Sequence, residues 1–286
     1  MKSRLMASVA AFSLLLSGCK PNSQSGPAPS EQPQDEDGVG TRHTPAEIVL
    51  PLRDSINLEL VRISAGKFMM GSPDEDSEQR QEGPIHEVTI SRMFYMGKYL
   101  VTQEQYAAIM GENPSRFTGA RRPVEQISWN DARAFCEKAS KISGRAVRLP
   151  SEAEWEYACR AGTNTQFGFG DDRRLLGKHA WYRMNSDGQT HPVGKKKPNH
   201  WGLYDMNGNV WEFCQDDWYF DYRGAPKDGA ARVHPKDWEC CVCRGGSWAS
   251  TPDSLSSSSR MPRRKDVRDT DHSDCGFRVV VEVVFP

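Results

Sequence analysis

The chain has 286 residues, with 37 Lys or Arg against 38 Asp or Glu, so its formal net charge is −1. A nearly neutral chain has no electrostatic basis for binding nucleic acid, and we expect no nucleic-acid partner. The length allows one large domain or two small ones.

The first eighteen residues are typical of an export signal. Lys2 and Arg4 precede an uncharged apolar run over residues 6–16. This run is too short to cross a bilayer, which needs roughly 20 apolar residues. It ends in Leu-Ser-Gly-Cys, the pattern that lipoprotein signal peptidase cuts before a diacylated cysteine. We therefore predict a lipoprotein signal peptide over 1–18 and lipidation of Cys19; a plain secretory signal is the alternative.

Residue 20 is Lys rather than Asp, which favours sorting to the outer membrane. Three acyl chains exceed what stable anchoring requires. We therefore expect an outer-membrane lipoprotein that faces the periplasm and meets the membrane through Cys19. Residues 19–55 are rich in Pro, Ser and Gln without apolar periodicity, so they are interpreted as a flexible tether. The folded domain is expected over 56–286.

Helices are predicted over 102–111, 128–144 and 151–162, each with Thr or Ser at the start and Gly at the end. The predicted strands are short, over 59–63, 86–90, 94–99, 242–244 and 276–284. Between residues 160 and 240, Gly, Asn and Asp are frequent and periodicity is weak. These features predict a loop-rich α+β domain.

Seven segments, in order, carry a resemblance to one family. They are GKFMMGS at 66–72, EGPIHEV at 82–88, PV with ISW at 123–129, RLPSEAEWEYA at 148–158, PN with GLYDMNGNVWE at 198–212, RGGSW at 244–248 and GFRV at 276–279. Together they resemble the formylglycine-generating-enzyme, or sulfatase-modifying-factor, family over nearly all of 56–286. The resemblance implies a single α+β domain similar to an elaborated C-type lectin and stabilised by calcium.

Four positions could bind calcium. Carboxylates of Asp205 and Glu212, with carbonyls of Gly208 and Val210, can converge on a cation that prefers six to eight oxygen ligands. The same positions match the calcium ligands of the family. The alternative is a Gly-Asn turn with a solvent-facing acid. A second family site would lie in 181–188, where Asn185 and Asp187 could contribute, although this loop looks shortened.

The two cysteines with which the family's copper enzymes bind Cu(I) are missing. The resemblance places them at Ser250 and Leu255, and neither side chain can replace a thiolate. We therefore expect no formylglycine formation by the copper mechanism. Copper or iron elsewhere is possible but unsupported by the sequence, because no pair of histidines has metal-binding spacing.

Seven cysteines follow Cys19: Cys136, Cys159, Cys214, Cys240, Cys241, Cys243 and Cys275. An odd number leaves at least one thiol free or paired with another molecule in an oxidising compartment. The simplest pairing joins Cys275 to Cys243 or Cys241. A copper or redox site and free thiols are the alternatives.

The expected pocket contains Trp211, Ser247, Trp248, Ser250 and Arg260. Ser250 has no base partner in the sequence pattern, so it is not an activated nucleophile. Trp, Ser and Arg in a cleft suit a periplasmic protein or small-molecule partner. Our first hypothesis is a binding or regulatory component of an envelope complex. The alternative is a non-copper oxidoreductase that matures an exported metabolite or protein, as the siderophore-maturing relatives do.

Overall fold

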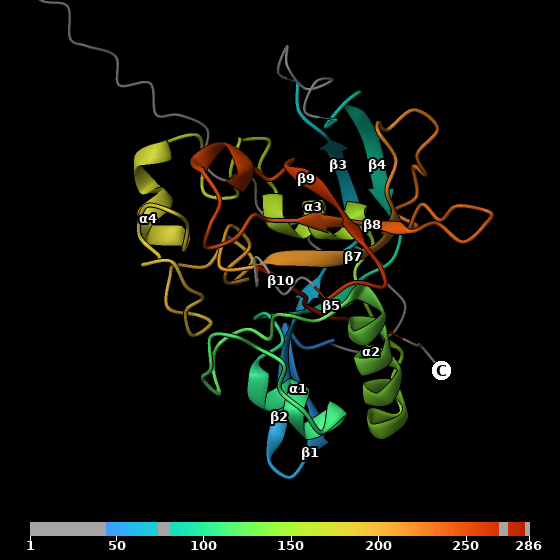
Figure 1. Cartoon of the computed structure of the whole chain (residues 1–286). Helices are drawn as coiled ribbons and strands as arrows, with labels where there is room; N and C mark the ends of the chain where they lie inside the picture. The colour runs from blue at the N-terminus through green and yellow to red at the C-terminus, as the bar shows by residue number, and fades with distance from the viewer. Residues whose placement is uncertain (1–43, 74–80, 269–273, 284–286) are drawn as a thin grey trace, which may run out of the picture. The chain divides into compact units, whose positions relative to one another are not determined.

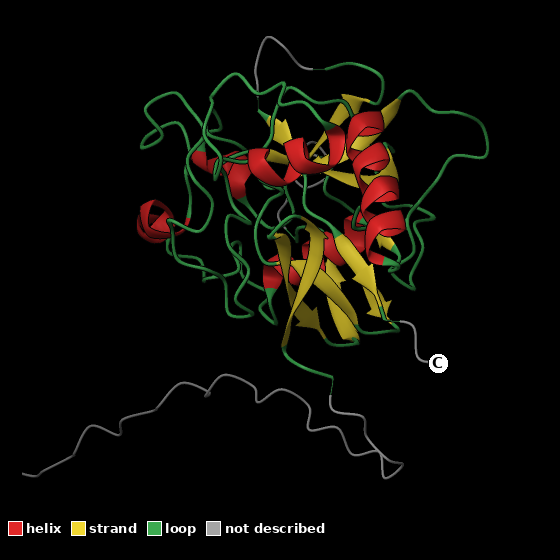
Figure 2. Cartoon of the chain, turned by 90° about the horizontal axis from the view of Figure 1, so that it is seen from below, coloured by secondary structure: helices red, strands yellow, loops and turns green. Residues whose placement is uncertain are grey.

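The computed structural model describes residues 44–73, 81–268 and 274–283 (Figure 1). The predicted signal peptide, Cys19 and the tether up to residue 43 lie outside the described residues. Among the helices that the structure describes, none is long and apolar enough to cross a membrane. Figure 2 shows that loops connect the helices and strands over much of the domain, as the composition predicts.

The larger sheet has five antiparallel strands in the order β1-β2-β5-β11-β6. Their bounds are Glu47–Arg53 for β1, Ile56–Ile63 for β2, Phe94–Gly97 for β5, Val280–Glu282 for β11 and Val147–Arg148 for β6. The chain ends of the domain therefore meet in one sheet, because β1 and β2 open the fold and β11 closes it.

Strand β1 corrects the expected domain boundary, since it lies inside the segment 19–55 that was interpreted as tether. Leu50 and Leu52 are buried while their neighbours are exposed, which is the two-residue period of a half-buried strand. Pro51 is tolerated because β1 is an edge strand. Because this segment contains prolines, it was interpreted as tether, but the folded domain begins before residue 56.

A second sheet has the order β10-β7-β8-β9. Its strands are Cys275–Gly276 for β10, Trp211–Asp217 for β7, Cys240–Arg244 for β8 and Arg260–Arg264 for β9. A separate hairpin-like pair joins β3 (Gly66–Met70) to β4 (His86–Ile90). The strand expected over 276–284 is wrong as one element, because the chain leaves the second sheet at Gly276 and enters the first at Val280.

The three predicted helices are confirmed as α1 (Gln103–Met110), α2 (Trp129–Ser143) and α3 (Glu152–Arg160). Each begins with a complete capping box, in which the cap hydroxyl accepts from the N3 amide and the N3 side chain accepts from the cap amide. Helices α1 and α2 contact β1 of the larger sheet, whereas α3 contacts β3, β7 and β8. Short helical turns occur at Arg173–Leu175, Leu176–His179 (α4) and Pro252–Leu255.

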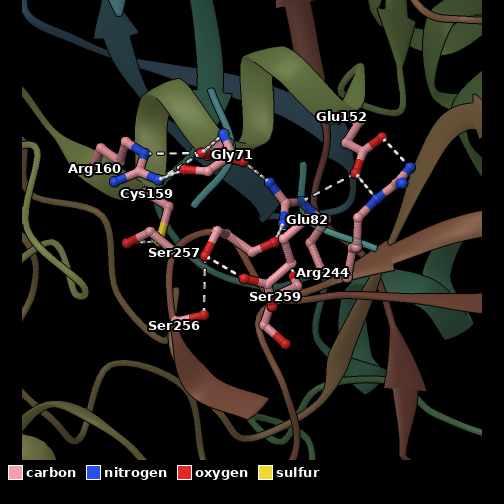
Figure 3. Close-up of polar contacts among 12 residues, drawn as sticks. Gly71, Glu82, Glu152, Cys159, Arg160, Arg244, Ser256, Ser257 and Ser259 are labelled. Atoms are coloured by element: carbon pink, nitrogen blue, oxygen red, sulfur yellow. Dashed lines mark hydrogen bonds and ion pairs between the residues drawn. The ribbon is translucent and has the colours of Figure 1, made fainter. Parts of the chain in front are cut away.

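A buried charge network connects α3 to the second sheet (Figure 3). Glu156 is fully buried and accepts from Arg244 of β8, from Arg160 Nε at 2.8 Å and from the Gly71 amide at 2.9 Å. Burial opposes its ionisation, but Arg160 and Arg244 outweigh that effect and hold the pKa of Glu156 below its ordinary value. Glu156 is therefore the charge that compensates two buried guanidinium groups.

Replacing Glu156 should destabilise the domain strongly. Glu156→Ala leaves Arg160 and Arg244 buried without their shared carboxylate, so we expect a loss of about 3–5 kcal/mol in the free energy of unfolding. Glu137→Ala is the matched control, because Glu137 forms an exposed i,i+4 pair with Arg133 that contributes roughly 0–1 kcal/mol. Urea unfolding followed by circular dichroism measures both, and equal losses would contradict the role given to Glu156.

Candidate functional site

The turn after β8 and the start of β10 bring two serines and an acid together. Ser250 Oγ accepts from the Ser247 amide at 2.9 Å and lies 3.3 Å from Ser247 Oγ. Ser247 Oγ also donates to Asp274 Oδ2 at 3.3 Å, and Arg263 Nη2 donates to Asp274 Oδ1 at 3.0 Å. Asp274 was not foreseen, because only strand pairing brings residue 274 beside residue 247. These residues are called the serine corner below.

Aromatic side chains border the serine corner. Trp248 is half-buried and meets Phe117 edge-to-face at 5.4 Å between ring centroids. Its backbone is fixed by the Asn209 carbonyl and by the Ser186 hydroxyl, which donates to the Trp248 carbonyl at 2.8 Å. Trp211 is buried, and its amide donates to the Asp274 carbonyl at 2.7 Å. Four of the five expected pocket residues therefore surround one corner.

Arg260 does not join the serine corner, which corrects its expected place at the pocket floor. Its guanidinium forms a bidentate ion pair with Glu152 at 2.7 and 2.8 Å and lies over the Trp218 and Tyr222 rings. It also donates to the Tyr219 carbonyl at 2.8 Å. These contacts occupy the guanidinium in the interior, so Arg260 supports the fold.

Ser250 and Leu255, where the resemblance places the copper ligands of the family, make contacts within the fold of this chain. Ser250 is held by Ser247, as described above. Leu255 is fully buried among Phe167, Leu176 and Ala180. A hydrogen-bonded hydroxyl and an apolar side chain do not fit Cu(I), so this corner cannot supply copper chemistry.

The predicted calcium loop has an unusual backbone. Asp205, Gly208 and Asn209 have φ values of 56°, 93° and 66°, in the left-handed region that Gly, Asn and Asp tolerate best. At position 208 a Cβ would lie 2.2 Å from the Trp181 carbonyl oxygen, so only Gly fits. Asn209 was missed by the sequence analysis. Its side chain accepts from the His191 amide and donates to the His191 carbonyl, which joins two irregular segments.

Two buried carboxylates lie in this loop. Glu212 is fully buried and both of its oxygens accept from Arg278, at 2.6 and 2.9 Å. Asp205 Oδ2 accepts from the Gly194 amide at 2.8 Å. Burial raises the pKa of Asp205 to about 6, and nearby Glu212 adds to the shift. Arg278 faces Glu212 and Lys196 lies near Asp205, so each carboxylate has a cationic neighbour within the protein.

The structure gives less support for the second expected calcium site, at Asn185 and Asp187. Asn185 Oδ1 accepts from the Tyr182 amide at 2.9 Å, and its side-chain amide donates to the Ala180 carbonyl. Asp187 is exposed. Among the described residues, no three His, Cys, Asp or Glu side chains are grouped so that they could hold a metal ion. A cation in either loop would therefore depend on carbonyl oxygens.

The seven described cysteines are free thiols, so neither expected disulfide is present in the structure. Strand pairing nevertheless brings three of them together. Burial, with hydrogen bonds to Cys241 and Cys275, raises the pKa of Cys243 well above its ordinary value. Arg263 Nε donates to Cys275 Sγ at 3.2 Å. Cys275 therefore contacts Cys243 and the arginine of the serine corner.

Glu125 is a buried acid that the sequence analysis missed. It follows the segment that pairs with α1, and Oε1 accepts from the Phe117 amide at 2.8 Å. In the described part of the chain, Oε2 is buried without a hydrogen-bond partner. Burial raises the pKa of Glu125 to about 7, despite the opposing hydrogen bond. Because Phe117 contacts Trp248, this proton-binding group lies close behind the serine corner.

The fold and this corner define an α+β domain of the formylglycine-generating-enzyme class. Residues 52–283 match the sulfatase-modifying factor enzyme 1-like domain, and the chain belongs to this family. It is 31% identical to the chaperone protein LppX of Paenibacillus barcinonensis, over 69% of this chain and 81% of that protein. It is 30% identical to the formylglycine-generating enzyme of Mycobacterium tuberculosis, over 79% of this chain and 98% of that enzyme. The solved structure of PvdO from Pseudomonas aeruginosa matches with a TM-score of 0.75 and 33% identity, covering 84% of this chain and 100% of that one.

Glu125 should make stability depend on pH. Its pKa in the folded protein, about 7, lies above the ordinary value of 4.5, so its stabilising contribution is complete below pH 4.5 and disappears as pH rises through 7. Glu125→Gln keeps the oxygen that accepts from Phe117 and cannot ionise. We expect the free energy of unfolding of this variant to exceed that of the parent by about 1–3 kcal/mol at pH 8. Near pH 5 the two free energies should be equal.

Urea unfolding at the two pH values measures this difference. The control is Glu104→Gln, because Glu104 is more exposed and pairs with Arg121 at 3.6 Å. The free energy of unfolding of this variant should change little at either pH. An equal effect of Glu125→Gln at pH 5 and pH 8 would contradict the raised pKa.

Proposed function

We propose that this protein is a lipid-anchored component of the bacterial envelope that binds a periplasmic partner at the serine corner and does not make formylglycine. The observation that carries this proposal is the replacement of both copper-ligand positions by Ser250 and by the buried Leu255. Trp248 and Phe117 provide contact area, while Ser247 and Asp274 are buried and hold the corner in shape through their hydrogen bond. The similarity to LppX, a protein named as a chaperone, supports a binding role.

The anchor part of the proposal places Cys19 in the outer membrane and the domain in the periplasm. Its support is the signal sequence, which ends in Leu-Ser-Gly-Cys and is followed by Lys20. The segment between Cys19 and Thr44 has 24 residues, and as a flexible chain it would allow the domain to search for partners over a few nanometres. A tethered domain meets envelope partners at raised effective concentration, which suits a modest binding site.

We also propose a structural calcium ion held by Asp205 and Glu212 with the carbonyls of Gly208 and Val210. Its support is the match of these four positions to the calcium ligands of the family and the left-handed backbone at Asp205 and Asn209. Calcium would supply positive charge there and stabilise the folded state by mass action. No chemistry at the serine corner depends on it.

Metal analysis of the full-length protein, purified from membranes in detergent, tests the calcium site and the binding role together. We expect about one calcium per chain, and its loss in Asp205→Ala. Asp253→Ala is the control, because Asp253 is a well-exposed carboxylate paired with Arg173 on another surface. Calcium retained by Asp205→Ala would contradict the site. Copper or iron bound at near one per chain would contradict the non-enzymatic role and favour the alternative, an oxidoreductase that matures an exported metabolite or protein.

Photocrosslinking in intact cells tests the partner site and the anchor. A photoreactive residue at the exposed position Ala249, beside Trp248, should give one discrete adduct with a periplasmic protein. The same residue at exposed Ile142 on α2 is the control and should not give that adduct. Cys19→Ala should move the protein to the soluble periplasmic fraction and weaken the adduct. Equal adducts at both positions, or none at Ala249, would contradict the proposal.

A further inference from the structure

A cavity lies on another part of the domain and shares no lining residue with the serine corner. It has a volume of about 650 Å³, within the roughly 300–1,000 Å³ that is usual for ligand sites. Helix α2 forms one wall through Trp129, and the loop of residues 233–239 forms another through Trp238. Gln215 of β7 and Leu149 also line it. Two indole rings from separate elements therefore border one open cavity.

Trp238 is held in an exposed position by stacked side chains. It is 40% exposed, and its ring lies 4.7 Å from the His234 ring at an interplanar angle of 20°. His234 in turn stacks on Tyr219 at 5.8 Å, and the Arg232 guanidinium lies 3.7 Å from the Tyr219 ring. Exposing a large aromatic ring costs solvation free energy, and fixing it in advance lowers the entropy cost of binding. Such a ring is suited to serve as a platform for a ligand.

The cations of the cavity already have partners. Each faces a carboxylate, in the pairs Arg133–Glu137, Arg148–Glu154, Arg264–Glu239 and Lys265–Asp217. A strongly anionic ligand would have to break these pairs. In contrast, within the described residues the side-chain amides of Asn130 and Gln215 and the Trp238 indole N–H have no partner inside the protein. The groups left for recognition are these neutral hydrogen-bonding groups, ring faces and the Asp237 carboxylate.

Several backbone groups around the cavity are satisfied by the protein itself. The Val147 amide and carbonyl both bond the Ser140 hydroxyl, and the Gln215 amide donates to the Pro150 carbonyl. The Lys265 amide donates to the Glu239 carbonyl at 2.8 Å. An extended peptide binds by pairing with free backbone groups of a strand edge, and these three positions are already paired. A ligand that stacks a ring and presents hydroxyl or amide groups fits the remaining chemistry.

We infer that this cavity binds a short neutral saccharide, with one sugar ring stacked on Trp238 and its hydroxyl or N-acetyl groups hydrogen-bonded by Asn130 and Gln215. This site is independent of the partner site proposed above, because the two share no residue. A neutral saccharide leaves the ion pairs of the cavity intact, and the fixed Trp238 ring supplies an apolar face of the size of a sugar ring.

Titration calorimetry of the full-length protein in detergent with N,N′-diacetylchitobiose tests the inference. We expect saturable binding that weakens about tenfold or more in Trp238→Ala and less in Trp238→Phe, which keeps an aromatic face. Phe220→Ala is the matched control, since Phe220 is 70% exposed and does not line the cavity; it should bind like the parent. Thermal unfolding of each variant checks that the fold is retained.

A blocked, uncharged tri-alanine peptide is the competing probe. No binding of the peptide, together with Trp238-dependent binding of the saccharide, supports the inference. Absence of saccharide binding, equal affinity in Trp238→Ala and the parent, or Trp238-dependent binding of the peptide at equal affinity would each overturn it. None of these outcomes alters the crosslinking result expected at Ala249, so the two proposals fail separately.

Discussion

A fully buried ion pair between Arg244 and Glu156 sets the arrangement of this domain. Arg244 reaches from β8 to Glu156 on α3 and also donates to the carbonyls of Ser258 and Ser259. Isolated buried charges are costly, so the helix, the sheet and the serine segment can fold only together. Glu82 adds to this constraint by accepting from the Ser258 hydroxyl at 2.9 Å (Figure 3). The path into β9 is thereby fixed, and Arg260 is directed inward, away from the serine corner.

Side-chain amides hold together the loop segments of the domain, where helices and strands supply few backbone hydrogen bonds. Asn209 bonds both backbone groups of His191, and Asn199 donates to the Ala158 carbonyl at 2.7 Å and accepts from the Trp201 amide at 3.0 Å. Such amides both donate and accept, so one residue satisfies backbone groups of two segments. The loop of residues 205–212 belongs to this system, and its left-handed residues are Asp, Gly and Asn, which tolerate that backbone best.

The sequence predicts features that depend on neighbouring residues, and it misses features that depend on contacts between distant segments. The helix of 128–144 follows from a cap and a period within one segment, and the expected cap at Ser128 is confirmed. Strand β1 was missed because Pro51 resembles a linker residue until its edge position is known. The contact of Asp274 with Ser247 depends on the pairing of β10 with β7, and the buried state of Glu125 depends on the surrounding core. Such facts are properties of the fold and have no signature in a short window of sequence.

The two positions where the family resemblance places copper-binding cysteines are well fitted to other side chains in this chain. A poorly fitted side chain would leave a void or an unpaired polar group there. Here Leu255 fills an apolar cluster and Ser250 accepts a backbone hydrogen bond. The turn before them is closely fitted as well: a Cβ on Gly246 would lie 2.5 Å from the Leu255 side chain and 2.7 Å from the Ser254 carbonyl oxygen. A corner so completely satisfied by its own atoms has little need of a metal to hold its shape. Such a corner keeps its shape through its own packing and hydrogen bonds, which is what the proposed binding role requires of it.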